Sequence, residues 1–164
     1  MALFKKAKIE KKVQEEVIDT GLVPEELVNV KQRDVLNSFL SSVLEVGDES
    51  DYEYLCDISA KAFYKKNALF LESIIETSGD DVKVAFEYLN YFLQTFGLGS
   101  FQALIKEDDK EIIVYHYNSP FDEIYEKDYF LKEFYRLFFD VLLDTKTDVV
   151  ERKEDDKKIF VINI

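Results

Sequence analysis

Apolar residues recur at helical spacing through the first half of the chain. Between residues 35 and 44 they fall at i, i+1, i+4, i+5, i+8 and i+9, the stripe of an amphipathic helix, and Gly47 is expected to end it. Ser50 and Glu53 have the spacing of a capping box, which predicts the start of a second helix. A break in that helix is expected near Asn67.

A further helix is predicted to begin after Asp80 or Asp81, because either carboxylate can cap a helix start. Its core-facing residues extend to Phe96, and Gly97 is placed to close it in the left-handed conformation. Leu69 is assigned to the buried face of the preceding helical segment. The first half of the chain is therefore predicted to consist of helices.

The apolar period then changes to that of β-strands. Residues 101–106 and 112–117 are rich in β-branched and aromatic side chains and flank a polar turn, which predicts a hairpin. Residues 149–152 and 159–164 flank a second charged turn and predict another hairpin.

Asn118-Ser119-Pro120 is expected to end the second strand, because proline removes a ladder donor. A long helix with aromatic residues on more than one side follows, from about Asp128 to about Thr145. The predicted fold class is α+β, with a helical N-terminal half followed by β-β-α-β-β and an antiparallel four-stranded sheet covered by helices. We expect residues 1–12 to be a basic flexible head and residues 13–164 to be a single α+β domain.

Charge narrows the classes of partner. The 164-residue chain is acidic, with a formal net charge of −13, so phosphate backbones repel it and nucleic acid is not expected as a ligand. Residues 1–12 contain five lysines and one glutamate, a net +4 that leaves −17 for the rest. We expect this head to be solvated, with a weak membrane-surface contact as the alternative. No run reaches the roughly 20 apolar residues of an integral membrane segment, and no signal-like core begins the chain, so we expect a cytoplasmic protein.

Few groups suit catalysis or metal binding. Cys56 is the single cysteine, which excludes an internal disulfide and a cysteine-rich zinc site. His116 is the single histidine; a partly exposed strand position, where alanine replacement leaves stability intact, is the simpler interpretation, and a catalytic or ligand role is the alternative. The glycine-rich phosphate loops, calcium loops and the serine-hydrolase elbow are missing from the sequence. We assign no catalytic residue, no metal ligand and no cofactor.

The second half resembles a known family. Gly97-Leu98-Gly99 precedes the first hairpin and Asn118-Ser119-Pro120-Phe121 follows it, before the aromatic helix and final hairpin, as in the four-vinyl-reductase domain. That family is similar in plan to heme nitric-oxide sensor domains and to subunits of TRAPP transport particles. The resemblance covers residues 96–164 and implies a small, often dimeric, cytoplasmic module for ligand sensing or protein assembly. Its members often carry cysteines near the last helix and hang a heme-binding histidine from a helix, and this chain departs from both patterns.

Aromatic residues are the most unusual feature of the composition, with 14 Phe and 10 Tyr and no Trp. The long helix has more apolar circumference than one sheet needs, so part of it must find another partner. Two interpretations stay open: a thick core wrapped by the N-terminal helices, or a dimer or partner surface. The candidate partner or ligand surface consists of Tyr88, Tyr91, His116, Tyr117, Tyr129 and Tyr135.

The leading hypothesis is a non-enzymatic interaction or regulatory module, a homodimer that binds a protein partner through an aromatic-rich surface. The first alternative is a small-molecule sensor that binds an apolar ligand in a pocket between the helices and the sheet. The second alternative is an enzyme that uses His116 with neighbouring carboxylates.

Overall fold

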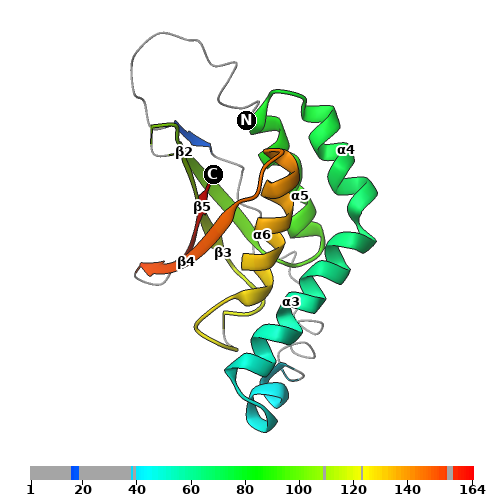
Figure 1. The fold of residues 1–164 in the computed structure, drawn as a ribbon, viewed down its shortest axis with the longest axis vertical. Coiled ribbons are helices and arrows are strands. Elements are labelled where there is room, and N and C mark those ends of the chain that lie inside the picture. Colours follow the sequence, from blue (N-terminus) through cyan, green and yellow to red (C-terminus); the bar gives the residue numbers. More distant parts are fainter. Residues whose placement is uncertain (1–15, 19–37, 39, 109, 123, 155–156) are drawn as a thin grey trace.

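A helical half and an antiparallel sheet make up the computed structural model (Figure 1). The predicted basic head, a short helix that the sequence Pro24-Glu25-Glu26 predicts, and the first residues of the helix expected at 35–44 lie outside the described residues. The structure describes residues 16–18, 38, 40–108, 110–122, 124–154 and 157–164.

The helices of the first half follow the predicted pattern. Residues 40–46 are helical, and Gly47 follows them directly. Asn67 separates the next two helices as predicted, and its side-chain amide donates to the carbonyl of Phe63 at 2.8 Å. The helices that follow Gly47 are α3 (Glu49–Lys66), α4 (Ala68–Ser78) and α5 (Val82–Thr95).

The start of α3 differs from the prediction. Asp48, and not Ser50, is the N-cap: its carboxylate accepts from the N–H of Asp51 at 3.1 Å, and the Asp51 carboxylate accepts from the N–H of Asp48 at 3.3 Å. Aspartate caps a helix as well as serine does, and Asp48 follows the helix-ending Gly47 directly. The helix therefore begins before Ser50, which lies within its first turn.

Both predicted ends of α5 are confirmed. Asp81 is the N-cap, and its side chain accepts from the backbone of Lys83 at 3.0 Å. At the other end Gly97 has φ +67°, and the N–H of Leu98 donates to the carbonyl of Leu93 at 2.8 Å. This is a Schellman motif, which satisfies carbonyls at the end of the helix and sets the direction in which the chain enters the sheet.

The two predicted hairpins form the antiparallel sheet, and the α+β class is confirmed. A short strand that the sequence did not reveal, β1 (Glu16–Ile18), pairs with the edge of β2 as a fifth strand. The strand order is β1-β2-β3-β5-β4, and all neighbours are antiparallel. The hairpin strands are β2 (Ser100–Lys106), β3 (Glu111–Tyr117), β4 (Asp148–Glu154) and β5 (Lys157–Asn163).

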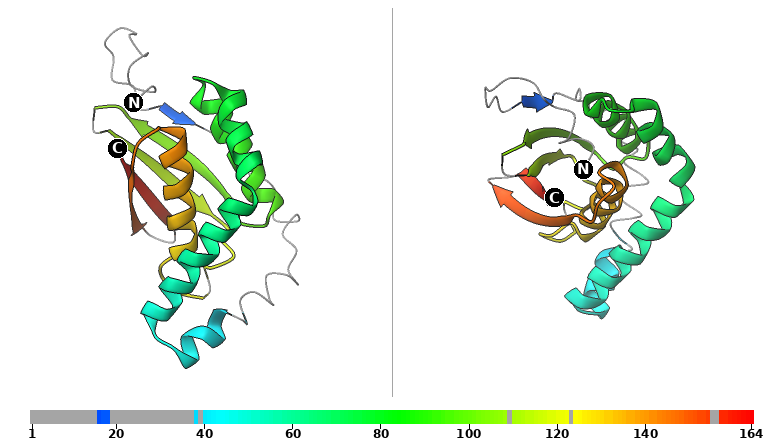
Figure 2. Two further views of the ribbon diagram at one scale, coloured as in Figure 1. Left: turned by 45° about the vertical axis from the view of Figure 1, so that its right-hand side comes forward. Right: turned by 45° about the horizontal axis from the view of Figure 1, so that its top comes forward.

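The long aromatic helix α6 (Tyr129–Leu142) lies across the sheet and begins after Asp128, as predicted. The views of Figure 2 show α3 outside α6, with α4 farthest from the sheet beside α5. The surplus aromatic rings of α6 are therefore buried between α3 and the sheet, which is the wrapped-core interpretation. Among the described helices, none is long and apolar enough to cross a membrane.

Aromatic rings fill the space between these helices and the sheet. Phe86 of α5 packs against Phe101 and Phe139 with ring centroids 5.8 Å away, and Tyr135 of α6 lies 5.2 Å from Phe160. All five side chains are fully buried. Edge-to-face contacts of this kind add to the free energy of burial and fix the rings in place.

Gly99 lets the chain after α5 pass close to the end of β3. Its φ is +96°, and a Cβ at this position would lie 2.4 Å from the Tyr117 carbonyl oxygen and 2.6 Å from Nε2 of His116. The backbone conformation and the close approach both require glycine. Gly79 provides a comparison, because its φ is +55° but a Cβ there would meet nothing within 4 Å.

We expect Gly99→Ala to lower the free energy of unfolding by about 3 kcal/mol, because the added methyl group collides with backbone and core atoms. Gly79→Ala adds only backbone strain, at φ +55° and ψ −118°, and should cost about 1 to 2 kcal/mol. Urea denaturation of the two variants measures the difference. Equal losses would show that the approach of Gly99 to His116 is not tight.

Candidate functional site

His116 lies on the core face of β3 with Ile112 and Val114, and only 2% of its surface is exposed. Its Nε2 lies 2.8 Å from the carbonyl oxygen of Leu98, and its Nδ1 lies 2.7 Å from the hydroxyl of Tyr135. A carbonyl only accepts, so Nε2 carries the hydrogen and Nδ1 accepts from the tyrosine. The expectation of a partly exposed histidine is therefore wrong.

Burial also keeps His116 and Tyr135 uncharged. Desolvation lowers the pKa of His116 to about 4, and it raises the pKa of Tyr135 well above its ordinary value. Both side chains are neutral near pH 7, and both ring nitrogens of His116 are occupied. The arrangement is suited to holding β3, α6 and the segment after α5 together, and it leaves no histidine atom for a substrate.

The remaining predicted surface residues are not brought together. Tyr129 is buried, and its hydroxyl donates to Glu49 at the start of α3. Tyr117 is half-buried, and its hydroxyl donates to Oε1 of Gln102 at 3.1 Å. Of the six candidate residues, only Tyr88 and Tyr91 are exposed. The single exposed aromatic surface predicted from the sequence is therefore wrong for His116, Tyr129 and Tyr135, which are buried.

A charged cluster is buried where α6 begins. Asp128 is the N-cap: its Oδ1 accepts from the N–H of Leu131 at 2.9 Å, and its Oδ2 accepts from the hydroxyl of Ser119 at 2.5 Å. The N–H of Asp128 donates to both carboxylate oxygens of Glu151 on β4, at 2.8 and 3.0 Å. Nζ of Lys158 lies 3.2 Å from Oδ1 of Asp122 and 3.5 Å from Oδ2 of Asp128, and it forms no well-aligned hydrogen bond with the described groups.

Desolvation dominates the electrostatics of this cluster. Burial raises the pKa of Asp128, against the opposing charge of Lys158, and it raises the pKa of Glu151 to about 7. Both carboxylates accept hydrogen bonds from backbone N–H groups at the start of α6, which favours a role in fixing this helix over a role in catalysis. Among the described residues, no group of three or more His, Cys, Asp or Glu side chains is arranged to hold a metal ion.

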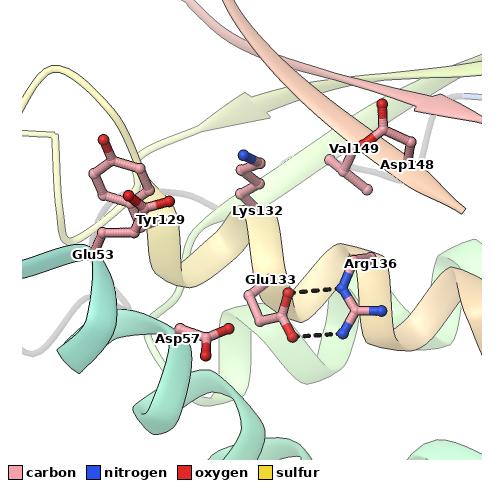
Figure 3. Close-up of a pocket in the computed structure, with 8 residues that line it drawn as sticks. All are labelled: Glu53, Asp57, Tyr129, Lys132, Glu133, Arg136, Asp148 and Val149. Carbon is pink, nitrogen blue, oxygen red and sulfur yellow. Dashed lines mark hydrogen bonds and ion pairs between the residues drawn. The ribbon is translucent and has the colours of Figure 1, made fainter. Parts of the chain in front are cut away.

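A polar cleft of about 210 Å³ lies between α3, α6 and the start of β4 (Figure 3). Two of its charged groups pair with each other: Arg136 donates to both carboxylate oxygens of Glu133 at 2.6 and 2.7 Å, and it also reaches Asp140 at 2.8 Å. Mixed, mutually paired charges on an open surface favour no particular ligand. The cleft is lined by Glu53, Asp57, Tyr129, Lys132, Glu133, Arg136, Asp148 and Val149.

Exposed apolar side chains gather instead on the outer side of α4 and α5. Phe70 stacks on the buried Phe92 with centroids 5.6 Å apart, and Phe96 contacts the same ring at 4.6 Å, so the two exposed rings share one surface. Tyr88 and Tyr91 lie earlier on α5, eight and five residues before Phe96. We name this surface the α4–α5 face; its members, with their exposed fractions, are Leu69 (87%), Phe70 (47%), Tyr88 (46%), Tyr91 (65%) and Phe96 (48%).

The sequence assigned two members of this face to the core. Leu69 is exposed because it lies on the side of α4 opposite the buried Leu71 and Ile74, and Phe96 is exposed because it lies at the C-cap, where α5 ends. The apolar doublets Leu69-Phe70 and Tyr91-Phe92 were the available signal, since a helix on a single core needs only one member of each.

Replacement of His116 tests its buried position. We expect His116→Ala to lower the free energy of unfolding by about 3 kcal/mol, because it leaves a cavity and unpairs the Tyr135 hydroxyl and the Leu98 carbonyl. Tyr135→Phe removes only the hydroxyl and should cost about 1 to 2 kcal/mol. Urea melts measure both losses, and a His116→Ala variant that melts like wild type would contradict the buried link.

Glu151 should give stability a measurable pH dependence. Its pKa rises from 4.5 to about 7 on folding, so the folded state binds more protons in that window and the free energy of unfolding falls as the pH rises through it. Relative to Glu151→Gln, which does not ionise, wild type should lose roughly 2 kcal/mol between about pH 4.5 and about pH 8. The contribution of His116 has the opposite sign and cancels in the comparison. Denaturant melts across this range that show a constant difference would contradict a raised pKa.

No protein-family model matches the chain, and no curated protein matches it. The resemblance to the four-vinyl-reductase domain therefore stays a prediction, which rests on the motifs around Gly97 and Pro120. The contacts and exposure of the described side chains are the basis on which a function can be assigned.

Proposed function

We propose that the protein is a non-enzymatic interaction module that forms a homodimer and binds protein through the α4–α5 face. The observation that carries the proposal is the exposure of five large apolar side chains on two adjacent helices of a chain whose net charge is −13. Large exposed apolar side chains that gather on neighbouring helices are typical of protein interfaces, and tyrosine suits the partly hydrated margins of such interfaces.

The composition of the surrounding surface supports the same function. Ser73 and Thr77 of α4 and Thr95 of α5 are exposed among these side chains, and the exposed Glu72, Glu76 and Glu87 lie beside them on the same two helices. Depletion of charge at the centre with charged residues at the rim is the usual composition of an interface.

The exposed side chains that could form a homodimer lie on the α4–α5 face and not on α6. The surplus rings of α6 are covered within the chain by α3, so they do not require a second copy. Among the described residues, none covers the α4–α5 face, and α4 lies farther from the sheet than α5 and α6 do (Figure 1). A cytoplasmic location remains part of the proposal.

The two alternatives have less support. A sensor would need apolar space between the helices and the sheet, and the rings of Phe86, Phe101 and Tyr135 occupy that space. An enzyme using His116 would need an accessible ring nitrogen, and both nitrogens are paired in the core.

Sedimentation tests the proposed interface with a matched pair of variants. We expect Tyr91→Ser to weaken the dimer about tenfold or more, because it removes a large, exposed ring from the face. Tyr54→Ser is the control, because Tyr54 is 67% exposed on α3, away from the face, against 65% for Tyr91. Neither replacement should change the free energy of unfolding by more than about 0.5 kcal/mol.

Two results would contradict the proposal. Wild-type protein that sediments only as a 19.3 kDa species at tens of micromolar would exclude the homodimer. A dimer that is weakened equally by Tyr91→Ser and Tyr54→Ser would place the interface elsewhere.

A further inference from the structure

We propose that two copies of the chain meet across the α4–α5 face in an antiparallel two-fold arrangement, with Lys66 of each copy opposite Glu76 of the other. This inference rests on the proposed homodimer and specifies how its two chains are oriented. It follows from the distribution of charged side chains around the α4–α5 face.

The α4–α5 face carries opposite charges at its two ends. Lys65 and Lys66 are exposed at the end of α3, immediately before α4 begins, and Glu76 is exposed near the end of α4. Lys66 follows Phe63 by one helical turn, and the Phe63 ring contacts Phe96 with centroids 5.1 Å apart, which places this lysine at the Phe96 end of the face. Neither Lys66 nor Glu76 makes an ion pair with another described residue.

A two-fold axis can take any direction within the plane of the interface, and two limiting directions differ in which charges they bring together. An interface between identical copies uses the same patch twice, so the two-fold axis lies in the plane of the interface. An axis along α4 makes the two helices parallel and brings Lys66 against Lys66 and Glu76 against Glu76. An axis across α4 makes them antiparallel and brings each Lys66 against a Glu76. Like charges opposed at an interface are strongly unfavourable, so the charge pattern selects the antiparallel arrangement.

The charges and the apolar side chains have separate parts in this arrangement. Rim ion pairs contribute little to affinity and mainly decide orientation, whereas buried apolar side chains supply most of the binding. Leu69 and Tyr91, the most exposed members of the face, lose the most accessible surface when a second copy covers them. The two cross-chain pairs also offset locally the repulsion between chains that each carry −13.

Charge reversal with cross-rescue tests the arrangement by sedimentation. We expect Lys66→Glu and Glu76→Lys each to weaken the dimer roughly tenfold, because each single variant opposes two pairs of like charges. The double variant should dimerise like wild type, since both pairs are restored in reversed sense. An equimolar mixture of the two single variants should form a heterodimer of wild-type affinity, because one interface pair is reversed and the other is native.

Lys146→Glu is the control, because Lys146 is exposed in the turn after α6 and should leave the dimer unchanged. The single-variant effects should also shrink in about 0.5 M salt, where screening extends over only a few ångströms. Circular dichroism melts equal to wild type would confirm that all the variants fold.

The possible outcomes distinguish the antiparallel arrangement from the proposed homodimer. Single variants that dimerise like wild type, or a double variant and mixture as weak as the singles, would overturn the antiparallel arrangement. If Tyr91→Ser still weakens that dimer, the α4–α5 face remains the interface. A wild-type monomer would overturn both the arrangement and the homodimer.

Discussion

A neutral histidine in the core joins the parts of the fold that the rest depends on. His116 of β3 donates to the carbonyl of Leu98, which follows the Schellman end of α5, and accepts from Tyr135 of α6. The link requires that Gly99 pass within contact of the imidazole and that the ring stay uncharged, which its burial ensures. With α5, β3 and α6 fixed to one another, the aromatic rings between them pack in one arrangement.

The start of α6 shows a second use of buried polar groups. Asp128 caps the helix while its own N–H is held by Glu151 of β4, so the helix is tied to the strand at the edge of the sheet. Burying two carboxylates beside one lysine costs free energy, and the helix N-terminus and the hydrogen bonds offset part of it. This cluster orients α6 so that α3 covers its outer rings and α4 and α5 are left on the outside.

The spacing of apolar residues in the sequence predicted most helices and strands, because that spacing reflects which side of each element is buried. They could not distinguish Asp48 from Ser50 as a cap, since both residues suit that position, nor reveal the short β1 strand. The candidate site was harder to predict, because the partners of His116 lie 18 and 19 residues away in the sequence. Exposure of Leu69 depends on which side of α4 faces the core, and that is a property of tertiary packing.

Packing of the core does not explain why aromatic side chains of α4 and α5 are exposed. Self-association is the proposed function that would bury them. Hydrogen exchange of the wild-type chain, compared at concentrations below and above its dissociation constant, tests this most directly. We expect α4 and α5 to exchange more slowly in the concentrated sample, while α6 and the hairpin strands stay unchanged. Concentration-dependent protection confined to α6 or β4, or none at all, would contradict an interface on the α4–α5 face.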